Sequence, residues 1–228
     1  MVQFSNRRSL RADARRLEIL RAAARTFRAV GFAAAGMRDI AAAADLSPGN
    51  LYHYFKGKEE LLFFCQRRAL DRLLAALERA RRTRGPLPKR LHALAVAHVL
   101  CLIDDVEGSA AHLEVSALPP GLRTPIVAKR DKYERGVRAL VEDGIRRGEL
   151  GALDSTVATR AFLGALNWTA YWFRPDGSQP PETVAEHVAA FAVAGLNTHD
   201  TRTPRVDDQR RTYGSRVRAV QDTARGPS

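Results

Sequence analysis

Apolar residues recur at helical spacing along most of the chain, and the alternation that marks β-strands is nearly absent. Glycine and proline interrupt the pattern at Gly31, at Gly57, in the GPLP of residues 85–88 and in the proline-rich stretch at 116–125. The chain is therefore expected to be all-α. The predicted helices span residues 11–30, 37–44, 48–54, 58–83, 87–104, 107–117, 125–147, 154–174 and 181–196.

The second and third predicted helices are separated by only a few residues. Ser47 is a favourable N-cap, and Pro48 suits the first position of the helix that follows. Such a short joint is typical of a helix-turn-helix, whose second helix can enter the major groove of DNA. We expect three parts: an N-terminal arm and helix-turn-helix domain at residues 1–57, a larger helical domain at 58–197, and a basic, disordered tail at 198–228.

The chain carries a strong positive charge. Its formal net charge is +12 and its pI is about 10.6, while 45% of its residues are hydrophobic and can form a core. This balance favours nucleic acid as a partner ahead of an anionic membrane surface, with a merely solvated basic surface as the alternative. Residues 1–30 contain eight arginines against two acidic residues, which suits either an arm in the minor groove or a solvated tail.

Other features limit the class of function. No apolar run has transmembrane length, the N-terminus lacks a secretory signal, and Cys65 and Cys101 stand far apart, all of which fits a cytoplasmic protein. Neither a phosphate-binding glycine loop nor a catalytic or metal-binding constellation is recognisable. His92, His98 and His112 are interpreted as ordinary helical residues. The sequence thus predicts neither an enzyme nor a cofactor or metal site.

The segment LSPGNLYHYFKGKEEL at residues 46–61 combines aromatic rings, a histidine and lysines. Leu51 and Phe55, at i and i+4, should point inward, and Tyr52 and His53 should then face DNA. A tyrosine hydroxyl can donate to a phosphate while its ring packs on the protein. This segment therefore predicts the helix that contacts DNA.

The two ends of this segment suggest different roles. Pro48, Gly49 and Asn50 stand at the helix N-terminus, which approaches base edges, and Asn50 has the side chain suited to reading a base, preferably adenine. Lys58 begins the next helix, where free N–H groups and a cation together favour phosphate.

The longer segment GMRDIAAAADLSPGNLYHYFKGKEELL resembles the DNA-binding signature of the TetR family of bacterial transcriptional regulators. The resemblance implies a TetR-like fold, a cytoplasmic homodimer, a two-fold symmetric operator in double-stranded DNA and a small ligand that releases it. It also implies that Arg38 contacts a phosphate or the edge of a guanine. One departure is Gly36, where the family has a hydroxyl-bearing cap. The expected DNA-binding residues are Arg38, Ser47, Pro48, Gly49, Asn50, Tyr52, His53 and Lys58.

The last two predicted helices, which contain AFLGALNWTAYWF and TVAEHVAAFAVAGL, are apolar around much of their circumference. A helix with more than one apolar face needs two partners. One partner is its own core, and the other is plausibly the same helix pair of a second subunit, in a four-helix interface.

The stretch LGALNWTAYWFRPDG also resembles TetR regulators that respond to acyl-CoA thioesters. We expect a small hydrophobic effector, such as an acyl-CoA, to bind in a pocket lined by rings and a few polar groups. For Trp168 and Trp172, the alternative to ligand contact is packing in the core and the dimer interface. For Arg130, the alternative is a surface ion pair with Glu134. The expected ligand-binding residues are Arg130, Leu163, Asn167, Trp168 and Tyr171.

The sequence therefore predicts a homodimeric, ligand-responsive repressor. A regulator of efflux type, which responds to hydrophobic or cationic drugs, is the first alternative; Asp104 and Glu114 are the acidic residues that could serve it. A sequence-blind architectural DNA-binding protein is the second, but it would not need so large a ligand-type domain.

Overall fold

The computed structural model describes residues 2–103 and 114–197. Within these residues the chain forms eight α-helices, one short 3-10 helix and no strand, which confirms the all-α prediction. The elements are α1 (Val2–Ala34), α2 (Met37–Ala43), α3 (Pro48–Tyr54), α4 (Lys58–Arg82), α5 (Leu87–Ile103), η2 (Val115–Ala117), α6 (Pro120–Arg146), α7 (Ser155–Trp172) and α8 (Pro181–Ala194).

Two of the described helices differ from their predicted bounds by more than two residues. Helix α1 begins at Val2 and continues beyond Gly31, where the backbone leaves helical geometry (φ 76°, ψ 160°) before one further turn. Helix α6 begins at Pro120, because proline is tolerated at the first helical position, and it includes Pro125, where the prediction had placed its start. Most of the helix expected at 107–117 lies outside the described residues, as do Asp104, His112 and the predicted tail.

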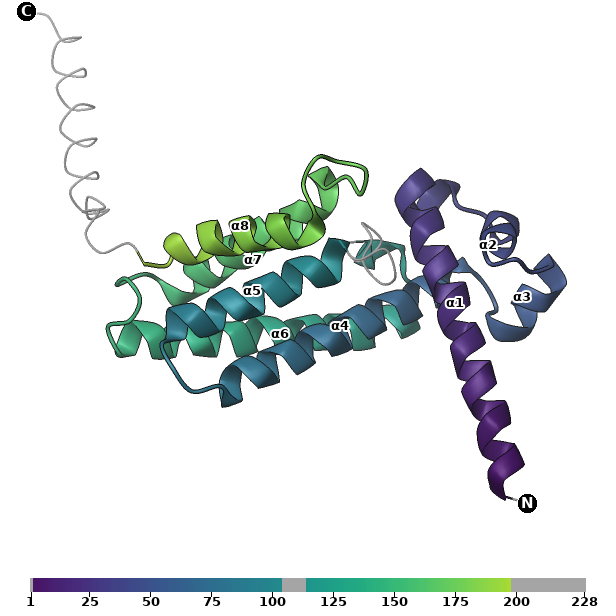
Figure 1. Ribbon diagram of the computed structural model, residues 1–228, viewed down its shortest axis with the longest axis horizontal. Coiled ribbons are helices and arrows are strands. Elements are labelled where there is room, and N and C mark those ends of the chain that lie inside the picture. The colour runs from purple at the N-terminus through teal and green to yellow at the C-terminus, as the bar shows by residue number, and fades with distance from the viewer. Residues whose placement is uncertain (1, 104–113, 198–228) are drawn as a thin grey trace, which may run out of the picture. The chain divides into compact units, whose positions relative to one another are not determined.

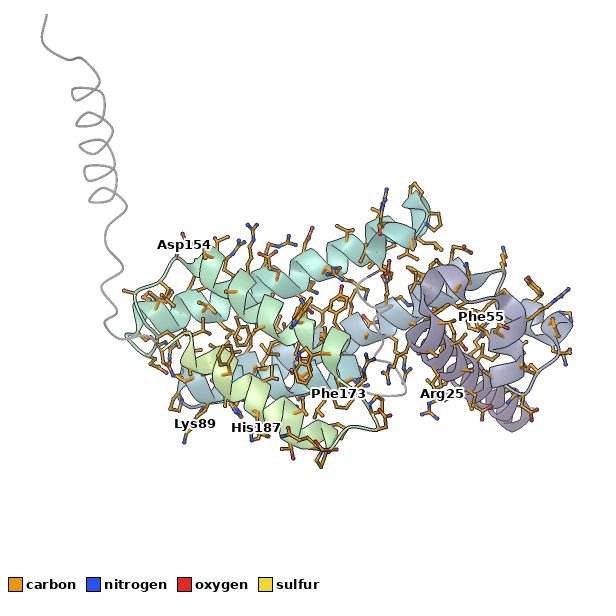
Figure 2. All side chains as sticks on the ribbon, turned by 90° about the horizontal axis from the view of Figure 1, so that it is seen from above. Arg25, Phe55, Lys89, Asp154, Phe173 and His187 are labelled. Carbon is orange, nitrogen blue, oxygen red and sulfur yellow. The ribbon has the colours of Figure 1, made fainter. Side chains whose placement is uncertain are left out.

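Helix α5 is the centre of the C-terminal part of the described chain. Figure 1 shows it running between α8 on one side and α4 on the other, and it also packs against α6 and α7. Its inner residues, among them Leu91, Leu94 and Val99, are buried. Side chains fill the space between these helices, as Figure 2 shows. The buried residues of these helices form a continuous hydrophobic core.

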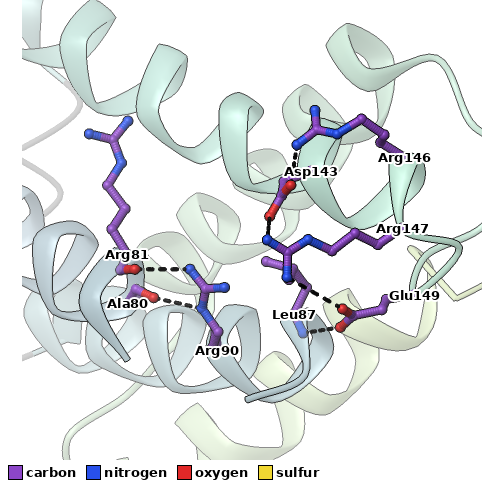
Figure 3. A network of polar contacts seen from close by, with 8 residues as sticks. All are labelled: Ala80, Arg81, Leu87, Arg90, Asp143, Arg146, Arg147 and Glu149. Carbon is purple, nitrogen blue, oxygen red and sulfur yellow. Dashed lines mark hydrogen bonds and ion pairs between the residues drawn. The ribbon is translucent and has the colours of Figure 1, made fainter. Parts of the chain in front are cut away.

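Polar contacts hold the helix ends where α4, α5 and α6 meet (Figure 3). Arg90 donates from Nε to the carbonyl oxygen of Ala80 at 2.8 Å and from a terminal nitrogen to that of Arg81 at 3.2 Å, so it caps the last turn of α4. At the end of α6, Asp143 pairs with Arg147 at 2.9 Å and also with Arg146. These contacts satisfy backbone and charged groups that the helix ends would otherwise leave unpaired.

The N-terminal helices enclose their own group of buried residues. Ile19 and Phe27 of α1 and Ile40 of α2 are buried, and Leu51 and Phe55 join them, as the sequence predicted. Helix α4 packs against α1 as well as against α5 and α6. One long helix therefore belongs both to the small core near the N-terminus and to the core around α5.

Candidate functional site

The joint between α2 and α3 has the geometry of a tight turn. The N–H of Leu46 donates to the carbonyl oxygen of Ala41 at 2.9 Å, and Asp45 adopts a left-handed backbone conformation (φ 54°). Arg15 of α1 donates to the carbonyl oxygens of Ala44 and Asp45 at 3.3 and 3.2 Å. These contacts fix the start of α3 against α1, which is what a recognition helix requires.

The predicted capping residues of α2 and α3 occupy their expected positions. The Oγ atom of Ser47 accepts a hydrogen bond from the backbone N–H of Asn50 at 3.2 Å, with Pro48 at the first helical position. Gly36 is the N-cap of α2, and its backbone N–H donates to the carboxylate of Asp39 at 3.0 Å. The hydroxyl of Ser47 therefore serves first to start the helix.

Most of the residues predicted to contact DNA lie on the surface. The side chain of Tyr52 is 54% exposed, whereas its neighbour Leu51 is completely buried. The division between inward and outward residues of α3 is the one that the spacing predicted. The other exposed members of the set are Arg38, Ser47, Pro48, Gly49, Asn50 and His53.

Lys58 begins α4 as predicted, but its side chain contacts the protein backbone. Its Nζ atom donates to the carbonyl oxygens of Phe32, Ala33 and Ala35 at 3.1, 3.0 and 3.2 Å, and it lies 4.8 Å from the centre of the Phe32 ring. An ammonium group has three hydrogens, and these carbonyls can accept all of them. The geometry therefore does not favour the predicted phosphate contact: Lys58 ties α4 to the end of α1.

Replacing Lys58 with methionine is expected to lower the free energy of unfolding by about 2 kcal/mol, because charge-assisted hydrogen bonds to three carbonyls are lost. The salt dependence of DNA binding should not change, because no phosphate contact is lost. Urea unfolding and binding titrations at several salt concentrations measure both effects, with the exposed Lys56 replaced by alanine as the control. Unchanged stability together with a weaker salt dependence would restore the phosphate role.

A cavity of about 290 Å³ lies among α4, α5, α6 and α7. Three of the predicted ligand-binding residues, Arg130, Leu163 and Asn167, line it together. Burial lowers the pKa of the Arg130 guanidinium below its usual value, which places this charge in a poorly hydrated environment. The remaining lining residues are Leu70, Leu73, His98, Asp131, Tyr133, Glu134, Arg160 and Gly164.

The cavity has a polar end built from three helices. His98 of α5 lies with Nδ1 3.0 Å from the hydroxyl of Tyr133 on α6 and with Nε2 3.2 Å from Oδ1 of Asn167 on α7. Burial lowers the pKa of His98 to about 4, so the ring is neutral at physiological pH. Burial also raises the pKa of the Tyr133 hydroxyl, which therefore keeps its proton. In the structure, His98, which the sequence pattern indicated to be an ordinary helical residue, joins Tyr133 and Asn167 at the polar end of the cavity.

Trp168 and Tyr171, also predicted to bind the ligand, lie outside this cavity. Neither is among the described residues that line the cavity; their rings stack with centroids 5.0 Å apart, and they are 62% and 53% exposed. The reason is the helical rotation: Trp168 follows Asn167 by 100°, and Tyr171 lies one turn beyond the cavity, near the end of α7.

Trp168 belongs to an exposed face of α7. The residues at spacings of three and four, namely Val157, Ala161, Gly164, Trp168 and Trp172, are all exposed and carry no charge. On the neighbouring helix α8, Phe191 is 75% exposed. Large exposed apolar residues gathered on one surface are characteristic of sites of interaction. We call these six residues the α7–α8 face.

The chain matches two family descriptions. Residues 19–63 match "Bacterial regulatory proteins, tetR family", and residues 85–196 match "Tetracyclin repressor-like, C-terminal domain". The first match covers the helix-turn-helix, and the second covers α5 to α8; most of α4 lies between the two matches. The part of the chain that the structure describes contains no helix both long enough and apolar enough to cross a membrane.

Named proteins with similar sequences are transcriptional regulators. The chain is 30% identical to the transcriptional repressor KstR2 of Mycobacterium tuberculosis, over 81% of this chain and 94% of that protein. It is 36% identical to the transcriptional activator FasR of Mycolicibacterium smegmatis, over 84% and 88%. Among solved structures, AibR in complex with isovaleryl coenzyme A and operator DNA is 27% identical, with a TM-score of 0.66 over 78% of this chain and 97% of AibR.

Proposed function

Since the chain belongs to the TetR family of bacterial transcriptional regulators, we propose that it is a homodimeric repressor, released from a palindromic operator by a small hydrophobic effector. The observation that carries the coupling is the course of α4. Its first residue, Lys58, bonds to the end of α1, while Leu70 and Leu73 line the cavity. A ligand that moves α4 would thus move the DNA-binding helices. The proposed repressor acts in the cytoplasm, where its operator lies. 

In this proposal, α3 is the helix that recognises DNA. The exposed N-terminal residues of α3 enter the major groove, and Tyr52, His53 and Arg38 contact the backbone of the operator. The N-terminal domain at residues 1–57 then reads DNA, and the domain at 58–197 binds the effector and the second subunit. The exposure of these side chains and the burial of Leu51 support this division.

Replacing Asn50 with alanine is expected to relax base preference at one position of each half-site. A good contact of an amide side chain to a base is worth about 1–3 kcal/mol of discrimination, and the penalty for the wrong base should fall by that amount. Competition binding with all single-base variants of a half-site measures it. His53→Ala is the matched control, because a lost phosphate contact weakens binding to every sequence alike. An unchanged base preference in the Asn50 variant would contradict the role of Asn50.

The α7–α8 face supports the part of the proposal that concerns the homodimer. Two copies of this face can form a four-helix interface in which each subunit buries the rings of the other, as the sequence pattern suggested. A two-fold dimer presents two copies of α3, which matches an operator of two inverted half-sites. The small residues Ala161 and Gly164 would allow the helices to approach closely.

An acyl-CoA thioester is the effector that we propose. The cavity combines apolar walls with a polar end, and Arg130 and Arg160 bring positive charge to its lining. Of its two acidic residues, Glu134 lies 3.8 Å from Arg138, and Asp131 is exposed. This arrangement suits an acyl compound with an anionic carrier better than a cationic drug. The complex of the similar protein AibR with isovaleryl coenzyme A points to the same class.

Selection of binding sites from random DNA tests the proposed function. We expect an enriched inverted repeat that the protein prefers by about 10³-fold or more over random DNA at a fixed salt concentration. Absence of any enriched sequence would favour the architectural alternative. Transcription from a promoter that carries the selected operator then distinguishes repression from activation. This test is needed because the relative FasR is named a transcriptional activator.

A further inference from the structure

The hydrogen bonds at the polar end of the cavity have a defined direction. His98 is buried and neutral, so its ring carries one proton, on Nδ1 or on Nε2. The atom of Asn167 that faces Nε2 is the oxygen Oδ1, at 3.2 Å, and an amide oxygen can only accept. The proton is therefore on Nε2, and Nδ1 must accept the proton of the Tyr133 hydroxyl, 3.0 Å away.

This direction determines what Asn167 offers to a ligand. The oxygen of Asn167 accepts from His98. Its Nδ2 atom carries two N–H donors, and these remain for a ligand in the cavity that Asn167 lines. Arg130, which also lines the cavity, has only donors. The carboxylates at the rim belong to Asp131 and Glu134, and the latter pairs with Arg138. The polar end of the cavity thus matches a ligand atom that accepts hydrogen bonds.

The size of the cavity limits how much of an effector it can hold. Its volume of about 290 Å³ is at the lower end of the range for sites that enclose drug-sized ligands. Leu70, Leu73 and Leu163 supply apolar lining beside the polar end. A short acyl chain and its carbonyl group fit such a space, whereas the nucleotide part of coenzyme A would have to stay outside it.

We propose that Asn167 determines the specificity of this site by donating a hydrogen bond to the carbonyl oxygen of a short acyl group, and that His98 and Tyr133 are positioning residues. His98 holds the amide with its oxygen turned away from the ligand, and Tyr133 fixes the ring of His98 in the tautomer that does so. This inference rests on the proposed function, because it identifies the group recognised at the same effector site. An ammonium group placed against the amide of Asn167 is disfavoured, since donors would face donors.

A pair of ligands that differ only in the carbonyl oxygen tests the inference. From a panel of thioesters between acetyl-CoA and octanoyl-CoA, the one that binds the wild-type protein most tightly is compared by calorimetry with its S-alkyl thioether, which keeps the chain and the coenzyme. We expect the thioester to bind about tenfold or more tightly than the thioether, because a site built to donate a hydrogen bond discriminates against a ligand that lacks the acceptor. Equal affinities would overturn the inference.

Variants assign the preference to Asn167. Asn167→Asp keeps an oxygen for His98 but removes both N–H donors, and it should abolish the preference for the thioester. Leu163→Ala is the control: it removes apolar lining without changing the donors, so both ligands should lose affinity by a similar factor. A thioester preference that survives in Asn167→Asp would contradict the assignment.

The positioning role has its own readout. His98→Gln retains an N–H donor in the place of Nε2 and should preserve much of the thioester preference, whereas His98→Leu should lose it. The ¹H–¹⁵N spectrum of the His98 side chain should show a protonated Nε2 and an unprotonated Nδ1, and Tyr133→Phe should disturb this state. A protonated Nδ1 in the wild-type protein would overturn the positioning role. Failure of every thioester to bind would instead contradict the proposed effector class, so the two failures are distinguishable.

Discussion

Replacing Gly136 with alanine is expected to lower the free energy of unfolding by about 1–3 kcal/mol, the usual cost of adding a group to a well-packed core. Gly136 lies in the middle of α6 and is buried against α4. A Cβ atom there would lie 2.2 Å from Cδ2 of Leu77 and 3.3 Å from a terminal nitrogen of Arg81. Because Leu77 is itself buried, its side chain has little room to move away.

Thermal or urea unfolding at a fixed protein concentration measures this effect, since association changes apparent stability. Gly121→Ala, in the first turn of the same helix, is the matched control, because no heavy atom lies within 4 Å of the added group. The double variant Gly136→Ala/Leu77→Ala should lose less stability than the sum of the two single losses, as expected for two residues in contact. Equal stability of the two glycine variants would show that α4 and α6 do not pack as closely as described.

Introducing charge into the α7–α8 face is expected to have the largest effect on function. The double variant Trp168→Glu/Phe191→Glu should be monomeric, because four carboxylates would have to be buried in one two-fold interface. A monomer contacts a single half-site and loses the gain from binding two linked sites. Operator affinity should therefore fall by a factor of about 10² or more.

Light scattering after size exclusion, together with operator titrations, measures both consequences. Val127→Glu on α6 is the control, because Val127 is also an exposed apolar residue but lies outside the α7–α8 face. This variant should remain dimeric and keep its operator affinity. A double variant that is still dimeric and still binds its operator fully would contradict the assignment of this face to dimerisation.

Helices α2 and α3 could be predicted to within one residue from sequence, because local signals determine them. Ser47 and Pro48 start α3, and the spacing of Leu51 and Phe55 defines its buried side. Lys58 was the exception. Its partners are backbone carbonyls 23–26 residues earlier in the chain, and no local pattern shows where those carbonyls lie.

The cavity was predicted only in part, because it is assembled from four helices. Leu163 and Asn167 of α7 were predicted to bind the ligand, and both line the cavity, whereas Tyr171, predicted with them, is exposed outside it. His98 lies among apolar residues of α5, where a histidine gives no signal by itself. Its role depends on Tyr133 and Asn167, which are 35 and 69 residues away in sequence. The one indication in the sequence was that His98 is a polar residue within an apolar stripe of α5.

The measurement that tests the central proposal most directly is a reciprocal titration with the selected operator. Operator affinity is measured with and without the tightest-binding acyl-CoA, its free acid and a set of cationic hydrophobic drugs, and acyl-CoA affinity is measured with and without operator. We predict that one thioester, and not its free acid, weakens operator binding, and that operator weakens thioester binding by the same factor, as linkage requires. Independent binding of the two ligands, or release by cationic drugs alone, would contradict the proposal.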